Sequence, residues 1–517
     1  MTTNNIIVLC AFIAYMIIMI VIGFVCSKGN KNNEDYFLLG SWPAAMSAQA
    51  SDMSGWLLMG LPGAVYLAGT GEAWIAVGLL IGTILNWYIV SARLRKYTIV
   101  AGNSLTIPSF FKNRYRDHKN IIKIVSASII AVFFTVYTAS AFSSGAKLFA
   151  TLFSDSANGD ENYNQVYVIG LIVAAVVILV YTFMGGFKAV CTTDLIQGLM
   201  MIVAILSVPV LAYAILTFDT SFSSALAAKG VEQPAQFLNF FVNGDGTPVS
   251  AVSIISNLAW GLGYFGMPHI LVRFMAVKSN EEIKKSRKIA VVWVIISLTA
   301  SCLIGLIARG YLTAQLDDAT SESVFIRTIQ QLFSGNGVLI FIGGIFLCGI
   351  LAAIMSTADS QLLVTASAVS EDLYKGAVKK NASEKSSLLV GKIAVAVVAV
   401  IAFFIALNPK SSIMGLVSDA WAGFGSAFGP VVLLALFWKR STLSGAISGM
   451  ATGALTVIIW DYIPLVNGQT LYAATNLYSL VVGFGLALIV NVIVSLLSKK
   501  PSKEIMDEFD SIKNIEV

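Results

Sequence analysis

The sequence predicts an all-α polytopic membrane protein. Of its 517 residues, 57% are hydrophobic and only 12% are charged, whereas a soluble globular protein carries about 25% charged residues. Apolar runs of 18 residues or more recur along the chain, and each is long enough to cross a bilayer as a helix. The basic residues fall in the links between these runs. The composition therefore excludes a soluble domain and gives no sign of nucleic-acid binding.

Thirteen apolar segments are predicted to be transmembrane helices. The first follows an uncharged start and precedes Lys28 and Lys31, so we expect a retained helix rather than a cleaved signal peptide. The predicted spans are residues 6–26, 43–68, 73–92, 124–151, 165–184, 189–217, 250–276, 288–311, 336–366, 387–407, 412–437, 442–462 and 474–497.

The charges in the links predict the orientation of these spans. The links after spans three, seven, nine and eleven are rich in lysine and arginine, and we assign Arg273 to the second of them. Residues 152–163 carry no basic residue, and residues 218–249, a predicted external cap, carry only Lys229. Because cytoplasmic links are the basic ones, we expect the N-terminus outside and the C-terminus in the cytoplasm. Residues 1–497 then form one integral transporter domain, and residues 498–517 form a short cytoplasmic tail.

Two spans contain residues that weaken a helix near the middle. Span two carries QASDMSGWLLMG at 49–60, and an aspartate at the bilayer centre costs about 2.5–3.5 kcal/mol. Span seven carries three glycines and a proline within 260–269, each glycine costing about 1 kcal/mol and an interior proline about 3 kcal/mol. Transporters place broken helices in corresponding positions of two repeats. We therefore predict a five-plus-five core with repeats at about 43–217 and 250–437; the alternative is that the glycines only pack helices closely.

Span nine offers oxygen atoms that suit a small cation. Positions 353, 356 and 357 share one helical face, and two of them carry hydroxyl groups. With carbonyl oxygens freed near Ala50 and Met53, they would make about five oxygen ligands for a monovalent cation, and the absence of clustered carboxylates argues against Ca²⁺. The alternative is that Ser356 and Thr357 hydrogen-bond to their own backbone.

Patterns typical of enzymes and resident metals are missing from the sequence. The five cysteines have no metal-ligand spacing and there are only two histidines, so a His/Cys metal site is not expected. The sequence contains no phosphate-binding loop, nucleophile elbow or zinc-protease motif. We predict that the protein is not an enzyme and holds no organic cofactor.

Several longer stretches carry a family resemblance. They are SDMSGWLLMGLPGAVYLAG (51–69), FFTVYTAS (133–140), WGLGYFGMPHILVRFMA (260–276), LAAIMST (351–357) with EDLYK (371–375), and AWAGFGSAFGPVVL (420–433). They resemble the sodium/solute symporter family, most closely its bacterial sodium/proline symporters, and the resemblance runs over nearly the whole chain.

The resemblance implies a LeuT-like inverted-repeat core of thirteen spans, with Na⁺ bound between spans two and nine. The Na⁺ ligands that it implies are the main-chain oxygens of Ala50, Met53 and Ala353 and the hydroxyls of Ser356 and Thr357. It implies that Asp52 supports Na⁺ use and that Asp194 lies on the inward Na⁺ path. The implied substrate-binding residues are Ser54, Gly55, Trp56, Tyr137, Trp260, Tyr264 and Pro268.

These residue types fit proline, a small zwitterion with an apolar ring. Amides near Gly55 would bind the carboxylate, Trp260 and Tyr264 would flank the ring, and Tyr137 would close the other side. The alternative for such aromatics is packing or an interfacial belt. Asp52 would offset the charge of Na⁺, and it could also cap the second half-helix.

The sequence departs from the family in three places. The stretch LLGSWPA at 38–44 lacks an arginine that relatives carry just before span two. Asp359 and Asp419 stand where uncharged residues are expected. For Asp359 two settings remain open, a pair with a cytoplasmic lysine or a place facing the inward cavity.

We therefore predict a Na⁺-coupled importer of L-proline that works by alternating access in the cytoplasmic membrane. Its expected partners are L-proline, Na⁺ and the lipid bilayer, without nucleic acid and without an obligate protein partner. The alternatives are the same machinery with another amino acid, a carboxylate or a sugar as solute, and, more remotely, a solute sensor that does not transport.

Overall fold

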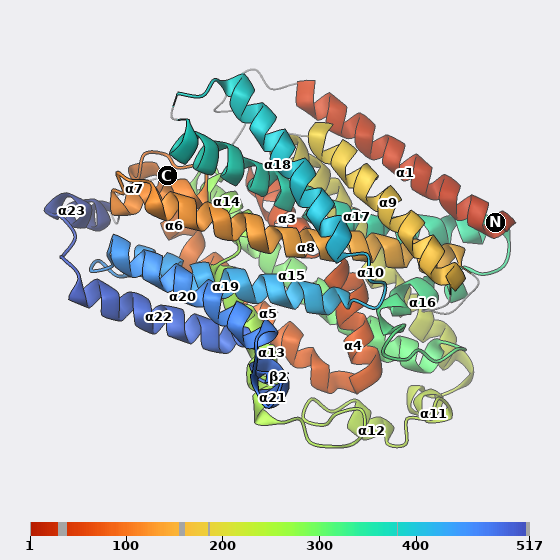
Figure 1. Cartoon of the computed structure of the whole chain (residues 1–517). Helices are drawn as coiled ribbons and strands as arrows, with labels where there is room; N and C mark the ends of the chain where they lie inside the picture. Colours follow the sequence, from red (N-terminus) through yellow and green to blue (C-terminus); the bar gives the residue numbers. More distant parts are fainter. Residues whose placement is uncertain (1, 29–38, 155–160, 185–186, 380, 513–517) are drawn as a thin grey trace.

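Long helices lying side by side make up most of the molecule (Figure 1). The computed structural model describes residues 2–28, 39–154, 161–184, 187–379 and 381–512. The elements up to the external cap are α1 (Thr3–Lys28), α3 (Ser41–Asp52), η1 (Trp56–Gly60), α4 (Leu61–Ala68), η2 (Gly69–Ala73), α5 (Trp74–Leu85), η3 (Asn86–Val90), α6 (Ser91–Val100), α7 (Ile107–Tyr115), α8 (Ile121–Phe153), α9 (Glu161–Met184), α10 (Phe187–Asp219), α11 (Phe222–Ala228) and α12 (Pro234–Phe237).

The remaining elements are again mostly helical, with one small antiparallel hairpin. They are α13 (Ala251–Ala259), η4 (Trp260–Phe265), α14 (Pro268–Met275), α15 (Asn280–Tyr311), η5 (Ser321–Ser323), α16 (Val324–Leu332), α17 (Gly337–Ser367), η6 (Ala368–Val378), α18 (Glu384–Ile405), α19 (Ile413–Phe437), α20 (Leu443–Tyr462), β1 (Pro464–Val466), β2 (Gln469–Thr470), α21 (Leu471–Thr475), α22 (Ser479–Leu497) and α23 (Lys503–Ser511).

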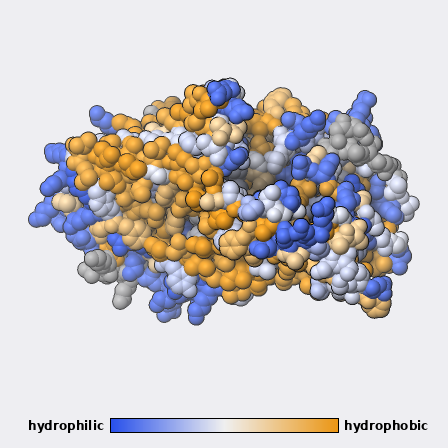
Figure 2. All heavy atoms as spheres, turned by 90° about the horizontal axis from the view of Figure 1, so that it is seen from below, coloured by the Kyte–Doolittle hydropathy of each residue, from blue (hydrophilic) through white to orange (hydrophobic). Residues whose placement is uncertain are grey.

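The described residues contain eleven helices that are long and apolar enough to cross a membrane, two fewer than the thirteen predicted spans. One reason is that residues 56–100 count as a single run, although α4 ends at Ala68 and Gly69 has a φ of +78°. The other is that the apolar run Ala251–Phe265 is too short to be counted. Figure 2 shows a broad apolar surface over the middle of the molecule, with hydrophilic residues gathered toward its ends.

The chain leaves α-helical geometry after Asp52, within predicted span two. Met53 has φ −86° and ψ 79°, and the helix resumes as the π-helical turn η1 at Trp56. Gly55 lies in this interval, where an added Cβ would come within 2.2 Å of the Ser144 hydroxyl on α8. A glycine is therefore needed here for close packing. Close packing was the alternative explanation for the glycines in these two spans.

The chain changes geometry again at Trp260, within predicted span seven. The 3₁₀ turn η4 follows α13, and α14 begins with Pro268 in its first turn, where a proline costs least. Added Cβ atoms at Gly261 and Gly266 would lie 2.3 Å from the Gly78 oxygen and 2.2 Å from the Phe424 oxygen. Gly261 in η4 and Gly266 just after it thus let α5 and α19 approach this backbone closely.

The predicted tail contains a helix that docks on the rest of the chain. On α23, Phe509 is 7% exposed, and the guanidinium groups of Arg93 and Arg114 lie 5.2 and 5.4 Å from the centre of its ring. Arg116 pairs with Glu508. Arg93 and Arg114 fall in the basic link predicted after span three; they lie on α6 and α7, and Arg114 is fully buried.

Replacing Phe509 with alanine is expected to release α23 from this surface. The Phe509 ring is buried in this contact, and truncation of a buried phenylalanine costs about 3–5 kcal/mol. Hydrogen exchange of residues 503–511 should accelerate strongly. Asp510→Asn, which removes only the half-exposed ion pair with Lys439, is the control and should have little effect, because exposed pairs contribute about 0–1 kcal/mol. Unchanged exchange in Phe509→Ala would contradict the docking.

Residues 218–249 form a small structure at the start of α5. They contain α11, α12 and a bridge between Val242 and Pro248. The indole of Trp74 donates to the Phe240 oxygen at 2.8 Å, and its ring meets Phe240 and Phe241 edge-on. This segment is therefore fixed to the membrane helices by aromatic contacts.

Candidate functional site

The broken segment after α3 meets α17 at a cluster of buried oxygen atoms. The Ser356 hydroxyl donates to the Ala50 carbonyl oxygen at 2.8 Å, and the Ala353 oxygen lies 3.3 Å from the same hydroxyl. The shorter bond joins α17 to α3. Ser356 therefore does not hydrogen-bond only to the backbone of its own helix, which was the alternative. Three of the five residues predicted as Na⁺ ligands are thus brought together.

The other two predicted Na⁺ ligands adjoin this cluster. Thr357 follows Ser356, and its hydroxyl is fully buried with no hydrogen-bond partner among the described residues. An unpaired buried hydroxyl is costly in a protein interior, and a cation would supply the missing partner. Met53 is buried at the break, and its sulfur accepts from the Trp293 indole at 2.9 Å. This bond fixes the residue whose carbonyl was predicted to bind Na⁺.

Asp52 links the two broken segments. Its carboxylate is fully buried and accepts from the Tyr264 hydroxyl at 2.6 Å through Oδ2, while Oδ1 has no hydrogen-bond partner in the described part of the chain. No side chain caps the start of η1, so the alternative role of Asp52 as a helix cap is not what the structure shows. A free carboxylate oxygen beside the oxygen cluster suits a nearby cation.

The residues predicted to bind substrate are all buried, and they come from several elements. Ser54, Gly55 and Trp56 lie at the first break, and Tyr137 projects from α8 beside Ser54 and Trp56. The Tyr137 hydroxyl lies close to the side chains of Ser54 and Trp56. Two buried hydroxyls on neighbouring elements would suit a polar ligand.

Trp260 and Tyr264 belong to one aromatic group with α19 and α22. The Trp260 ring stacks on Trp421 and Tyr478, with centroids 6.2 and 5.5 Å apart. Tyr264 meets the Trp421 ring edge-on at 5.1 Å. The Trp260 ring is thus held by two aromatic neighbours, while the Tyr264 hydroxyl reaches Asp52.

Arg273 is the largest correction to the sequence-based assignment. It is 1% exposed on α14, not in a link, so its charge says nothing about orientation. Its guanidinium donates to the Ser47 and Ser360 hydroxyls at 2.9 and 2.6 Å and pairs with Asp194 at 3.3 Å. A rule that counts every arginine near a span end could not identify this role.

The two aspartates without an expected role have distinct settings. Asp359 is fully buried, and its charged neighbours include Asp194 and Arg273. Asp419 accepts a hydrogen bond from the Tyr462 hydroxyl near the end of α20. One positive charge thus faces two buried carboxylates beside the oxygen cluster.

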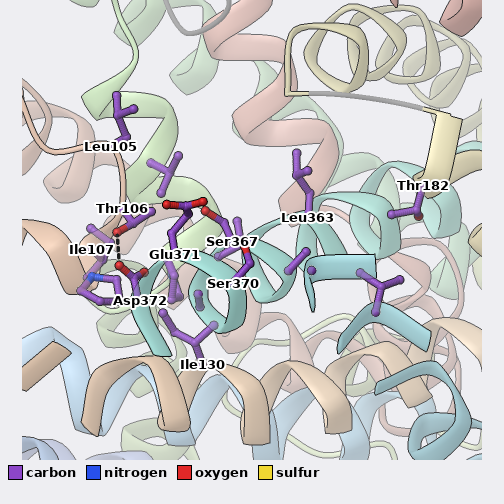
Figure 3. A pocket seen from close by; sticks show the side chains of 18 of the residues that line it. Leu105, Thr106, Ile107, Ile130, Thr182, Leu363, Ser367, Ser370, Glu371 and Asp372 are labelled. Atoms are coloured by element: carbon purple, nitrogen blue, oxygen red, sulfur yellow. Dashed lines mark hydrogen bonds between the residues drawn. The ribbon is translucent and has the colours of Figure 1, made fainter. Parts of the chain in front are cut away.

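A cavity of about 370 Å³ has Pro268 and Arg273 among the residues that line it. Its walls include Thr106 just before α7, Ile107 at the start of α7, Leu363 on α17, and the π-helical segment η6 (Figure 3). On η6, Asp372 accepts from the Thr106 and Ser109 hydroxyls at 3.2 and 3.0 Å and pairs with Lys123 at 2.9 Å. These contacts hold the mouth of the cavity between α7, α8 and η6.

A second cavity, of about 840 Å³, is lined by Lys147 and Glu322. These two side chains form an ion pair at 2.5 Å. Glu322 also accepts from the Ser412 hydroxyl at 2.9 Å and from the Met414 amide at 3.1 Å. Glu322 therefore ties η5 to α8 and to the start of α19.

Replacing Gly263 with alanine is expected to disturb the site, because the new Cβ would lie 1.9 Å from the Trp421 indole nitrogen. Overpacking of this kind typically costs about 1–3 kcal/mol, so the Tm of the purified protein should fall. Gly485→Ala on α22 is the matched control, since nothing lies within 4 Å of its added Cβ. A Tm for Gly263→Ala equal to that of the control would contradict the close contact.

A family model described as the sodium:solute symporter family matches residues 37–453. Two similar relatives are described as sodium/proline symporters. The protein from Haemophilus influenzae (strain ATCC 51907 / DSM 11121 / KW20 / Rd) is 44% identical over 513 residues, covering 97% of both chains. That from Staphylococcus aureus (strain JH9) is 42% identical over 514 residues, covering 97% of this chain and 94% of the relative.

Two solved structures share the fold. A Na⁺-coupled sialic acid symporter in a substrate-bound outward-open state aligns with a TM-score of 0.73 at 19% identity, over 96% of this chain and 98% of that one. Mhp1, a nucleobase-cation-symport-1 family transporter, aligns with a TM-score of 0.51 at 12% identity, over 92% of this chain and 97% of that one. These neighbours confirm the predicted LeuT-like, all-helical fold class.

Proposed function

This chain belongs to the sodium:solute symporter family, and we propose that it imports L-proline together with Na⁺. Family membership confirms the prediction from the motifs and identifies the protein as a multi-pass membrane transporter rather than an enzyme. Na⁺ is the ion that this family co-transports. Proline is supported by relatives that are described as sodium/proline symporters and match over nearly the full length.

The Na⁺ site that we propose consists of the main-chain oxygens of Ala50, Met53 and Ala353 and the hydroxyls of Ser356 and Thr357. The observation that carries it is the 2.8 Å bond from Ser356 to the Ala50 oxygen, which joins α17 to the end of α3. Neutral oxygen ligands suit a hard monovalent cation. Among the described residues, no group of three His, Cys, Asp or Glu side chains is placed to hold a metal ion.

The proposed proline site lies between the two breaks and α8. The neighbouring hydroxyls of Ser54 and Tyr137 and the backbone around Gly55 would bind the polar end of proline. Tyr264, Trp260 and Trp56 would form the apolar wall for its ring, and Pro268 would mark the boundary with the cavity of Figure 3.

The bond between Asp52 and Tyr264 offers a physical route for coupling. Na⁺ beside Asp52 would offset a buried negative charge that otherwise costs free energy. This would hold the carboxylate and its partner Tyr264 in one arrangement. Proline would then meet a preformed wall, so that each ligand raises the affinity for the other.

The driving force is sufficient for uphill uptake. One Na⁺ that moves down a potential of 100 mV supplies about 2.3 kcal/mol, and a tenfold concentration gradient adds about 1.4 kcal/mol. At one-to-one coupling this would support roughly 500-fold accumulation of proline.

For the topology, we propose two five-span repeats at about 43–217 and 250–437, with α1 starting outside and α23 in the cytoplasm. The basic links support this orientation. The cavity at η6 would then be the inward exit, and Na⁺ would leave past Asp194. A cysteine introduced at Ser502 should react with a membrane-impermeant thiol reagent only after cells are permeabilised. Reaction in intact cells would reverse the orientation.

The proposed function is tested by uptake of labelled L-proline into proteoliposomes that contain the purified protein. We expect accumulation above equilibrium only with an inward Na⁺ gradient, and competition by unlabelled proline. Gradient-driven uptake of another solute, without proline uptake, would support Na⁺-coupled symport but would reject L-proline as the substrate. Binding of proline without accumulation would contradict symport.

A further inference from the structure

Two side chains for which the sequence predicted no role donate hydrogen bonds to carbonyl oxygens of η4. The Trp421 indole donates to the Trp260 oxygen at 2.7 Å, and the Asn86 side-chain amide donates to the Tyr264 oxygen at 3.0 Å. We propose that Trp421 and Asn86 are positioning residues, which fix the backbone from which Trp260 and Tyr264 project. The inference rests on the proposed function, because it concerns the same substrate site.

The geometry of η4 makes these donors necessary. A 3₁₀ turn has poorer internal hydrogen bonds than an α-helix, and a buried carbonyl without a partner is costly. Trp421 and Asn86 are both 1% exposed, so these bonds form away from the surface. Each donor supplies one N–H group to the carbonyl of a residue predicted to contact substrate.

The two donors approach η4 from different helices. Asn86 follows α5, whose Gly82 packs so closely that an added Cβ would lie 2.2 Å from the Gly261 oxygen. Trp421 lies on α19 against Gly263. The absence of side chains at these glycines lets both donors reach the backbone of η4. Asn86, directly after α5, and Trp421 on α19 thus each donate a hydrogen bond to the backbone of η4.

The two donors are expected to have separable effects. Trp421 bonds to Trp260, whose ring belongs to the aromatic stack. Asn86 bonds to Tyr264, whose hydroxyl donates to Asp52. Loss of the Trp421 donor should therefore alter substrate selectivity, whereas loss of the Asn86 donor should alter both selectivity and Na⁺ dependence.

The test uses full-length protein in proteoliposomes. Trp421→Phe keeps an aromatic ring and loses the N–H group, and Asn86→Leu keeps the approximate side-chain size and loses the donor. Asn86→Ala removes the same donor without added bulk. Trp74→Phe is the control for Trp421, because its indole donates to the Phe240 oxygen at 2.8 Å, in the segment 218–249 rather than in η4. Ser91→Ala is the control for Asn86, because the Ser91 hydroxyl bonds to the Trp87 oxygen of its own helical turn.

Two quantities are measured. The first is the ratio of kcat/KM for L-proline to that for azetidine-2-carboxylate, its four-membered-ring analogue; this ratio does not depend on how much protein is folded. The second is the Na⁺ concentration for half-maximal uptake. We expect all three variants to change the ratio by about fivefold, the effect of one net hydrogen bond. Only the Asn86 variants should raise the half-maximal Na⁺ concentration, by about the same factor.

Unchanged ratios in Trp421→Phe and in both Asn86 variants would overturn the inference, as would equal changes in the controls. Hydrogen exchange of residues 260–266 provides a readout that needs no substrate, and it should accelerate in the variants but not in the controls. If the parent protein takes up neither imino acid, the proposed function fails and the exchange result alone decides the positioning role. Unchanged exchange would then reject it.

Discussion

Asp52→Asn is expected to abolish Na⁺-driven accumulation of proline while leaving the protein folded. Asparagine keeps an oxygen that accepts from Tyr264, at a distance of 2.6 Å in the parent, but it removes the buried negative charge. Loss of a charge next to the proposed Na⁺ site should raise the half-maximal Na⁺ concentration by about 100-fold. The measurement is initial uptake by proteoliposomes as a function of external Na⁺.

Asp419→Asn is the matched control for this prediction. Asp419 is a half-buried carboxylate that also accepts from a tyrosine hydroxyl, that of Tyr462, but it lies outside the oxygen cluster. Its substitution should leave the Na⁺ dependence within about twofold, because a distant charge is screened. Equal loss in both variants would show that the effect is not specific to the site. Full Na⁺ coupling in Asp52→Asn would reject the proposed role of Asp52.

Arg273→Met is expected to destabilise the protein by about 3–5 kcal/mol, the typical cost of removing one partner of a buried ion pair. The loss would leave Asp194 and Asp359 buried without their common positive neighbour. It would also remove the donor to the Ser47 and Ser360 hydroxyls. The midpoint of denaturant unfolding in detergent measures the change.

A second substitution separates charge from packing in this prediction. Arg273→Met combined with Asp194→Asn should recover part of the lost stability, because one unpaired charge is removed. Arg287→Met is the control, since Arg287 on α15 lies 3.9 Å from the centre of the Tyr88 ring, a contact that contributes about 0.5–1 kcal/mol. If the double variant is no more stable than Arg273→Met, packing rather than charge accounts for the loss.

The fold class was predictable because a bilayer permits few backbone arrangements. An apolar segment in lipid must satisfy its own hydrogen bonds, so hydropathy alone identifies most helices. Glycines and proline indicated where geometry changes, and the backbone is non-helical at Met53 and turns to 3₁₀ geometry at Trp260. The hydroxyls of span nine likewise indicated the contact between Ser356 and Ala50.

The contacts across the core were not predictable, because they join residues far apart in the sequence. Local spacing cannot show that Tyr264 reaches Asp52 or that Asn86 reaches Tyr264. An amide within an apolar span was the one available signal for Asn86, since buried polar groups require partners. Arg273 was misassigned because charge counts near a span end do not separate a buried side chain from a solvated one.

The docking of α23 has a consequence for the biogenesis of the protein. Its binding surface is made by α6 and α7, which are translated long before α23, a delay of tens of seconds at about 5–20 residues per second. During that time the aromatic and arginine side chains that later surround Phe509 have no partner from α23. The nascent chain thus completes its insertion before this face is covered. Ribosomal products that stop short of Lys503 would retain the membrane helices but expose this surface to chaperones and quality-control proteases.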